Sequence, residues 1–516
     1  MSRIRVAAPI ILLSLALAAN ATPALAATPD DGAPNVASSS VQTDGDGGAI
    51  NVRYVVYSLP EQTGRVQVTA VLTIPDRVTA LSVRAPADAT VLDADGLRST
   101  GSRWQWDGRS ETASLTYLLP VGMETAYGQR TAAGEQWSLV VRREVSLRAR
   151  WRWQRGPNPG WNETMVVPKG HEGVAGPSAV YLGPHETSVR ATNAGTIQLV
   201  VPEAATLRPA RAAVLDTIAA AQRSTTVGPA HEHLLVIAVP NQLARGGYVP
   251  ANGAPVMLVS ADERVDTPRN VWVHEYRHTR QYFRTSREMR WLEEGSADYY
   301  AARSTLEQGR ISYDRYRKRV TTDRFADADL TEPETWASPD VPYDKGGRVV
   351  AALDVRIRSA TGGERTFADV LDRLVRSSEP VTLASFAETV SMVAGEDLEA
   401  FVREAVTGPA PPIPADPDGD GVSTEEERER ETNPYRHPDQ DVQLQSGSER
   451  LQSGAGDVES AGVSAAPGGV GDDPSVADGG GRGDTARTDA PPLALFASSL
   501  AVLVGLLTAA LWRHRK

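Results

Sequence analysis

The pattern that most limits what this chain can fold into is a pair of histidines, His274 and His278, with Glu275 between them. Residues four apart on an α-helix project from the same face, so the two imidazoles can bind one metal ion. Glu275 lies one step around the helix, where its carboxylate can act as a general base toward water at the metal. Two imidazoles leave zinc under-coordinated. The pattern therefore predicts a helix that carries a zinc site, a third protein ligand and one open position.

The residues around this pair predict where the helix begins. Thr267 can cap it, and Pro268 can occupy the first turn, where a missing N–H costs nothing. Apolar residues then recur as far as Phe283, which places both histidines on the inward face. An ordinary amphipathic helix is the alternative, but histidine is rare here, with 8 in 516 residues.

A second motif follows at residues 291–299, which read Trp-Leu-Glu-Glu-Gly-Ser-Ala-Asp-Tyr. Together with the histidine pair it resembles the gluzincin metallopeptidases, and within them the aminopeptidase N-like branch. This resemblance implies that Glu294 is the third zinc ligand and that Glu293 is a solvated neighbour. The interval between His278 and Glu294 is a few residues shorter than is usual in that family, which indicates a trimmed connection between two helices.

Two more residues take roles from this resemblance. Asp298 is four residues beyond Glu294, and in thermolysin-like enzymes an acid at this spacing accepts a hydrogen bond from a zinc-bound imidazole. A plain surface aspartate is the alternative. Residues 341–347 read Val-Pro-Tyr-Asp-Lys-Gly-Gly before a helical run at 349–353, similar to the family's Tyr-x-Lys-Gly signature. The resemblance makes Tyr343 the donor to the oxyanion of peptide hydrolysis, whereas a tyrosine in a proline-containing loop can also serve packing alone.

One family element is missing. Exopeptidases of this family carry a Gly-x-Met-Glu-Asn loop whose glutamate binds the free amino terminus of the substrate, whereas residues 246–250 read Gly-Gly-Tyr-Val-Pro. Residues 252–260 predict a turn into a short strand, and in gluzincins the strand before the zinc helix is an edge that pairs with extended substrate. We therefore expect a peptide or protein substrate, and the choice between endopeptidase and aminopeptidase stays open.

The rest of the chain predicts a multidomain protein. Short alternating runs within residues 27–195 predict a β-sandwich. The clearest run, from Val145 to Trp153, alternates apolar residues with polar residues that are mostly arginine. This pattern favours a solvated arginine face over a site for an acidic ligand. Residues 196–410 predict an α+β gluzincin (thermolysin-like) catalytic domain with its strands first. The expected strands are 197–201 and 234–239, and the expected helices are 210–222, 367–375, 383–393 and 398–406.

The two ends predict export and anchoring. Residues 1–26 resemble a secretory signal peptide, and residues 491–516 predict one transmembrane helix with a short basic cytoplasmic tail, because positions 493–512 carry no charge. A glycolipid-anchor signal is the alternative, but the basic residues at the end of the chain argue against it. The expected location is the cell membrane, single-pass, with the folded domains outside.

Residues 411–437 predict a calcium-binding loop. Asp416, Asp418, Asp420 and Glu427 supply oxygen ligands at the spacing of a calcium loop, and the wording resembles thrombospondin type 3 repeats; an acidic linker is the alternative. Residues 438–490 have too few large apolar residues to bury a core and predict a disordered low-complexity tether.

Composition and isolated residues add exclusions. The net charge of −12 disfavours nucleic acid as a partner. The absence of cysteine removes disulfides as stabilisers of an exported protein. His231 and His233 alternate on a strand without a third ligand at metal spacing, which favours structural roles.

Three functions are compatible with these features. The first is a membrane-anchored extracellular zinc metallopeptidase, with Zn²⁺ at the histidines and Ca²⁺ in the stalk. The second is a catalytically silent gluzincin-fold protein for surface binding or adhesion. The third is an anchored structural protein whose metals only stabilise the fold. The joint presence of ligands, Glu275 and Tyr343 favours the first, because a silent site has no chemical need for a general base.

Overall fold

The computed structural model describes residues 48–413 apart from 123, 126, 127, 130, 155 and 241–245, together with residues 422, 423, 426, 427 and 430. The predicted signal peptide, tether and membrane anchor lie outside the described residues, as do Asp416, Asp418 and Asp420. In the described part of the chain, no helix is both long enough and apolar enough to cross a bilayer.

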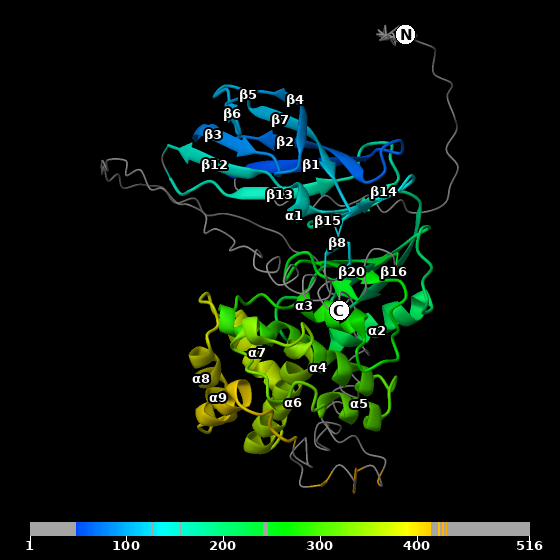
Figure 1. Ribbon diagram of the computed structural model, residues 1–516, viewed down its shortest axis with the longest axis vertical. Coiled ribbons are helices and arrows are strands. Elements are labelled where there is room, and N and C mark those ends of the chain that lie inside the picture. The colour runs from blue at the N-terminus through cyan, green and yellow to red at the C-terminus, as the bar shows by residue number, and fades with distance from the viewer. Residues whose placement is uncertain are drawn as a thin grey trace, which may run out of the picture. The chain divides into compact units, whose positions relative to one another are not determined.

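Residues 50–182 form three sheets and a two-stranded ribbon (Figure 1). The strand orders are β13-β1-β2-β7-β4, β12-β3-β6-β5 and β10-β11-β15-β14, with β8 paired to β9. The bounds are β1 (Ile50–Ser58), β2 (Arg65–Thr73), β3 (Val78–Arg84), β4 (Thr90–Asp95), β5 (Leu97–Ser99), β6 (Trp104–Trp106), β7 (Thr112–Pro120), β8 (Glu124–Thr125), β9 (Gly128–Gln129), β10 (Ala132–Ala133), β11 (Ser138–Val141), β12 (Arg148–Trp153), β13 (Trp161–Val166), β14 (Gly173–Ala175) and β15 (Ala179–Leu182).

Period-two burial explains why these strands form one core. In β1, β2 and β7 every second side chain is buried, and these side chains form a single cluster with buried residues of β3, such as Leu81 and Val83. Strands from two sheets that share one core make a sandwich. The predicted sheet-rich N-terminal domain is therefore confirmed, with a third sheet that the sequence did not reveal.

The tryptophan-rich strand begins later than predicted. Instead of extended backbone from Val145, the chain forms the one-turn helix α1 (Arg142–Val145) before β12 begins. The Tyr117 hydroxyl donates a hydrogen bond to the carbonyl of Val145, which holds this turn against the core. Within β12 the arginines are exposed and the intervening residues are half-buried. The predicted alternation and the solvated arginine face are therefore present, over fewer residues.

A five-stranded mixed sheet precedes the metal-binding motif, in the order β16-β17-β18-β20-β19. The three inner strands are parallel, and each outer strand is antiparallel to its neighbour. The helix α2 (Arg211–Ser224) connects β17 to β18 and packs on one face of the sheet. The strand bounds are β16 (His185–Thr192), β17 (Gly195–Pro202), β18 (His233–Val239), β19 (Gly247–Tyr248) and β20 (Val256–Ser260).

Two expectations about this sheet are corrected. The expected domain boundary after residue 195 falls in the hairpin between β16 and β17, where Thr192 lies opposite Gly195, so this sheet begins at His185. The strand expected within residues 252–260 is β20, but it is not the edge, because β19 pairs with its outer side. On this side of the sheet the edge strand is therefore β19.

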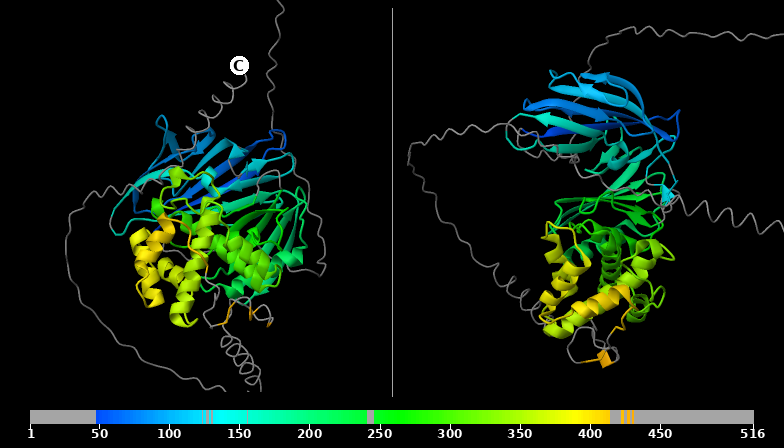
Figure 2. Two further views of the ribbon diagram at one scale, coloured as in Figure 1. Left: turned by 60° about the horizontal axis from the view of Figure 1, so that its bottom comes forward. Right: turned by 60° about the vertical axis from the view of Figure 1, so that its left-hand side comes forward.

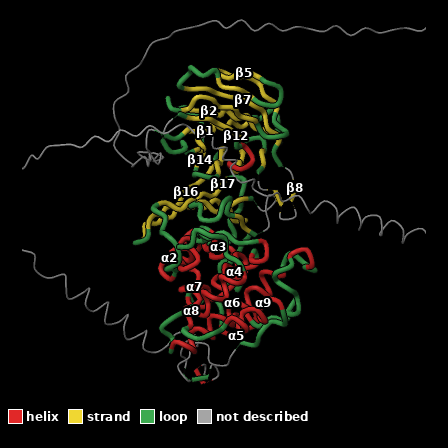
Figure 3. Tube along the Cα trace, turned by 90° about the vertical axis from the view of Figure 1, so that its left-hand side faces the viewer, coloured by secondary structure: helices red, strands yellow, loops and turns green. Residues whose placement is uncertain are grey.

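Helices follow the sheet, as predicted for an α+β domain (Figure 3). Buried residues of α4 to α9 form one large core, and Figure 2 shows α7 to α9, drawn in yellow, beside the green helices of the same domain. The helices are α3 (Val271–His278), α4 (Trp291–Glu307), α5 (Tyr313–Val320), α6 (Val341–Thr361), α7 (Phe367–Val375), α8 (Leu383–Ala394) and α9 (Glu399–Thr407), with 3-10 turns at Arg287–Met289 and Pro333–Thr335.

The helix that carries His274 and His278 begins at a different residue from the one predicted. Asn270, not Thr267, caps α3, because the Asn270 side chain accepts from the N–H of Val273 at 3.4 Å. The same buried side chain donates to the carbonyl of Val265 at 3.0 Å, which ties the helix start to the loop before it. The amide can therefore hold the loop and the helix start together, which a threonine three residues earlier cannot do.

Asp354, in the middle of α6, is the centre of a buried ionic network. Its carboxylate accepts from Arg303 at 2.6 Å, from Arg358 at 2.9 Å and from the Tyr299 hydroxyl at 2.6 Å. The N–H of Phe367, at the start of α7, donates to its second oxygen at 2.7 Å. Burial alone would raise the pKa of Asp354, but the two guanidinium groups outweigh it and lower the pKa.

We expect Asp354→Asn to lower the free energy of unfolding at pH 7 by about 3–5 kcal/mol, because it removes the carboxylate that two buried guanidinium groups share. The folded-state pKa of Asp354 is depressed, so its contribution is present above about pH 4 and is lost as the pH falls toward the folded value. Urea unfolding at pH 7 and pH 3 measures both effects. Asp372→Asn, in the exposed pair with Arg376, is the control, and equal losses in the two variants would contradict the account.

Candidate functional site

The three predicted metal ligands converge from two helices. His274 and His278 lie on one face of α3, and Glu294 lies in the first turn of α4. The Nε2 atoms of the two histidines are 3.0 Å apart, and each is 3.2 Å from Oε2 of Glu294. The ligand atoms of the three residues all lie within 4.8 Å of one another, and the described part of the chain holds no second group of this kind.

This donor set fits a zinc ion. Ligands at about 2.0–2.1 Å from a tetrahedral zinc lie about 3.4 Å from one another, close to the separations found here. Burial opposes a charge on His278, but the Glu294 carboxylate outweighs it and raises the pKa of His278 to about 10. A metal cation can replace that proton as the counter-charge of Glu294. Two imidazole nitrogens and one carboxylate form a known catalytic zinc set with one open position.

Gln281 orients the second histidine, a role that the sequence analysis missed. Its Oε1 lies 2.7 Å from Nδ1 of His278, and its Nε2 donates to the Glu293 carbonyl at 2.8 Å and to Ser296 Oγ at 3.1 Å. A carbonyl oxygen at Nδ1 places the proton there and leaves Nε2 for the metal. Gln281 follows the end of α3, so helical spacing could not have indicated its position.

The partner of Asp298 is Arg319, not the imidazole that the resemblance implied, so this expectation is wrong. Its carboxylate accepts from Arg319 Nε at 3.0 Å and lies 2.7 Å from Arg319 Nη2. Arg319 also donates to the carbonyl of Tyr343 at 3.1 Å and pairs with the buried Asp344. Asp298 therefore holds the start of α6 against α4 through Arg319 rather than supporting an imidazole. The competing cation lies on α5, beyond the reach of spacing arguments.

A pair of glycines sets how closely α4 and α6 approach. A Cβ at Gly295 would lie 2.8 Å from the backbone carbon of Gly346, too close for any side chain. Both glycines are in the two motifs, directly after Glu294 and shortly after Tyr343. The motifs therefore require glycine because backbone meets backbone where the ligand helix crosses the tyrosine helix.

We expect Gly295→Ala to lower the free energy of unfolding by about 1–3 kcal/mol, because the backbones must separate. The shift moves Glu294, so the zinc affinity should fall at least about tenfold, equivalent to about 1.4 kcal/mol. Thermal unfolding and competition with a chelator measure the two effects. Gly160→Ala is the control, since its nearest atom would lie 3.6 Å away; a zinc affinity unchanged in both variants would contradict this role.

Tyr343 lies in the first turn of α6, with Pro342 beside it. Its ring stacks on that of His274, with centroids 5.6 Å apart and an interplanar angle of 22°. The tyrosine is therefore beside the metal ligands, as the resemblance implied. Lys345 of the same signature is fully buried and donates to the carbonyls of Val406, at 3.3 Å, and of Gly408, so it fixes the end of α9 to α6.

Glu275 is buried beside the edge strand. It is 5% exposed, and a Cβ at Gly247 would lie 2.6 Å from its Oε1. Gly247 is a residue of β19, so this edge strand passes directly over the carboxylate of the predicted general base. A glycine is required there because any side chain would displace that carboxylate.

No acid occurs at residues 246–250, as the sequence showed. Two carboxylates lie against this stretch from outside it: that of Glu275 at Gly247, and that of Glu263, whose Oε1 accepts from the N–H of Gly246 at 3.1 Å. Of the isolated histidines, His231 lies 2.7 Å through Nε2 from the Thr279 carbonyl, consistent with the predicted structural role. Of the expected calcium ligands, only Glu427 is among the described residues, and it is buried.

Comparisons with known proteins give likeness in structure alone. No family model matches the sequence, and no curated protein matches it. An aminopeptidase N family protein from Idiomarina loihiensis aligns with a TM-score of 0.50 and 12% identity over 70% of this chain and 76% of its own. An M1 zinc metallopeptidase from Deinococcus radiodurans aligns with a TM-score of 0.47 and 15% identity over 71% of this chain and 94% of its own. The first match shows a shared fold.

Proposed function

We propose that this chain is a zinc-dependent metallopeptidase that hydrolyses peptide bonds. The observation that carries the proposal is the convergence of His274, His278 and Glu294 with Glu275 and Tyr343 at the same place. The three ligand atoms fit zinc, Glu275 lies on the ligand helix and Tyr343 lies against a ligand. A silent binding protein would not need this combination of ligands, base and donor.

The residues divide the reaction between them. When bound, zinc supplies Lewis-acid polarisation and lowers the pKa of water. Glu275 takes the proton from the attacking water and passes it to the leaving amine. The Tyr343 hydroxyl donates a hydrogen bond to the oxygen on which negative charge develops. Backbone groups of β19 offer pairing to an extended peptide, which would place its scissile bond beside Glu275.

The substrate would be selected through its main chain rather than through a terminal charge. Residues 246–250 offer no carboxylate for a free amine, and the carboxylate of Glu263 nearby is engaged by the N–H of Gly246. Pairing with β19 requires only an extended segment. This favours cleavage that does not depend on a free amino terminus.

The location and the calcium site are proposed from the sequence alone. A signal peptide at 1–26 and an anchor at 491–516 would hold the enzyme on the outer face of the cell membrane, with Asp416, Asp418, Asp420 and Glu427 binding calcium in the stalk. Cell fractionation of the full chain and of a version ending at residue 490 tests the anchor. Recovery of both in the soluble fraction would reject it.

Tyr343→Phe tests the proposed oxyanion donor. Loss of the hydroxyl should lower kcat about a hundredfold and leave KM and zinc content near those of the parent, because the bond forms only as charge develops. Steady-state hydrolysis of a fluorogenic peptide and elemental analysis measure these quantities. Tyr57→Phe, in β1 of the N-terminal domain, is the control. An unchanged kcat in the Tyr343 variant would remove this residue from the mechanism.

The proposal as a whole is tested by metal removal. Dialysis against a chelator should abolish hydrolysis of a fluorogenic peptide, and one equivalent of zinc per chain should restore it. Retention of full hydrolysis without metal would reject a zinc-dependent reaction.

A further inference from the structure

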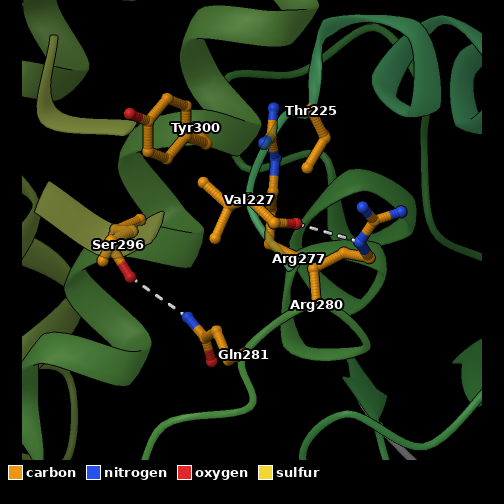
Figure 4. A pocket seen from close by; sticks show the side chains of 8 residues that line it. Thr225, Val227, Arg277, Arg280, Gln281, Ser296 and Tyr300 are labelled. Carbon is orange, nitrogen blue, oxygen red and sulfur yellow. Dashed lines mark hydrogen bonds between the residues drawn. The ribbon is translucent and has the colours of Figure 1, made fainter. Parts of the chain in front are cut away.

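A small cavity lies on the side of α3 and α4 that faces α7 and the loop after α2. Its lining includes Arg277, Arg280 and Gln281 of α3 and the turn after it, and Ser296 and Tyr300 of α4 (Figure 4). Its volume is about 10 Å³. A volume of this order holds a single water-sized species.

Arg277 is the unusual member of this wall. It is 7% exposed, and in the described part of the chain its guanidinium makes no ion pair and no hydrogen bond, with Nε fully enclosed. The centroid of the Tyr300 ring lies 4.5 Å from its guanidinium carbon. A buried charge without a counter-charge is strongly unfavourable.

Other buried arginines of the domain differ from Arg277. Arg303 and Arg358 share the carboxylate of Asp354. Arg280, on the same cavity wall, donates to the carbonyls of Val227 at 3.1 Å and Gly228 at 2.6 Å, and Figure 4 draws the first of these bonds. The fold therefore supplies acceptors to its other buried guanidinium groups, and leaves that of Arg277 without one beside a cavity.

We infer that this cavity binds one halide-sized anion on Arg277. The guanidinium is always charged and offers several N–H donors, so an anion supplies both the missing acceptor and the missing counter-charge. The volume corresponds to a single small ion.

The same cavity is coupled to the metal ligands. Gln281 lies in its wall and also contacts Nδ1 of His278 at 2.7 Å, while its amide donates to Ser296, another wall residue, at 3.1 Å. Arg277 directly precedes His278 in α3. An anion would fix this wall and so the orientation of His278. This effect on the metal rests on the proposed function, but binding of the anion does not.

Halide-specific stabilisation tests the binding. The thermal unfolding temperature of the full chain should rise and saturate with sodium chloride or bromide, but not with sodium gluconate at equal ionic strength. Arg277→Met should lose this difference, and Arg148→Met, an exposed arginine of β12, should retain it. Crystals soaked in bromide should give an anomalous peak at Arg277. Equal unfolding temperatures in halide and in gluconate, together with no anomalous bromide peak at Arg277, would overturn the inference. Both measurements can be made on the unsubstituted protein.

The coupling is tested in the Glu275→Gln variant, which needs no turnover. Saturating chloride should raise its zinc affinity by roughly fivefold to tenfold over gluconate, a usual size for coupling between sites, and Arg277→Met in that background should abolish the gain. A zinc affinity independent of halide, with bromide bound at Arg277, would retain the anion site and reject its coupling to the metal. Failure of peptide hydrolysis would leave both readouts intact.

Discussion

Glu275→Gln is expected to retain a full equivalent of zinc and to lower kcat for peptide hydrolysis about a thousandfold, within the range for loss of a general base. The substitution preserves the shape of the side chain beneath Gly247 and removes only its capacity to accept the proton. Both ligand histidines should keep their places on α3, because each reaches Oε2 of Glu294 through its own Nε2. Loss of turnover with zinc retained would place the proton transfer at this carboxylate.

The measurement pairs steady-state kinetics with elemental analysis on the same preparation. Gln67→Glu, on β2 far along the chain from the motif, is a matched control that changes the same two side-chain types. A variant that retains more than about a tenth of the parental kcat would show that another group accepts the proton.

His278→Ala should remove the metal and the activity together. The substitution deletes one of three ligands, and it also leaves the Glu294 carboxylate and Gln281 Oε1 without the imidazole between them. Removal of a ligand should weaken zinc binding by at least the 10–100-fold that loss of an outer partner costs. We expect less than about a tenth of an equivalent of zinc after dialysis and hydrolysis at background.

His233→Ala is the matched control, because His233 is the exposed first residue of β18. It should retain zinc and activity. Zinc retained at one equivalent in the His278 variant, with hydrolysis intact, would show that the metal is bound elsewhere.

The sequence was sufficient where a function is carried by local spacing. One site brings together the histidine pair, Glu294 and the tyrosine signature. They meet although α4, α5 and the start of α6 separate His278 from Tyr343 along the chain. Period two predicted a sheet-rich N-terminal domain, and helical spacing predicted Phe367–Val375 at its full bounds. In these cases each residue's role depends on neighbours along the chain.

The errors arise where a distant residue competes for a partner. Asp298 has the spacing of an imidazole support, but Arg319 from α5 takes its carboxylate. Asn270 caps α3 because its side chain also reaches Val265. β20 loses the sheet edge because Gly247–Tyr248 form β19 on its outer side. None of these choices is encoded in the spacing of one element, since each depends on how separate elements pack.

The glycines of the two motifs show why short signatures persist in such a fold. Gly295 and Gly346 face each other where α4 crosses α6, and Gly247 lies over Glu275. Each is required by a close approach of backbone to another group rather than by a turn. From the sequence they mark a motif, and only the structure shows which groups meet there.

The most direct test of the central claim is mass-spectrometric cleavage of a diverse peptide library with blocked and with free amino termini, using the full chain with zinc beside Glu275→Gln. The account predicts cuts inside blocked peptides that disappear in the variant, because β19 pairs with backbone and residues 246–250 hold no acid for a free amine. Trimming of free termini alone would assign an aminopeptidase instead. Equal cleavage by the variant, or no cleavage of any peptide by the zinc-loaded parent, would contradict the account.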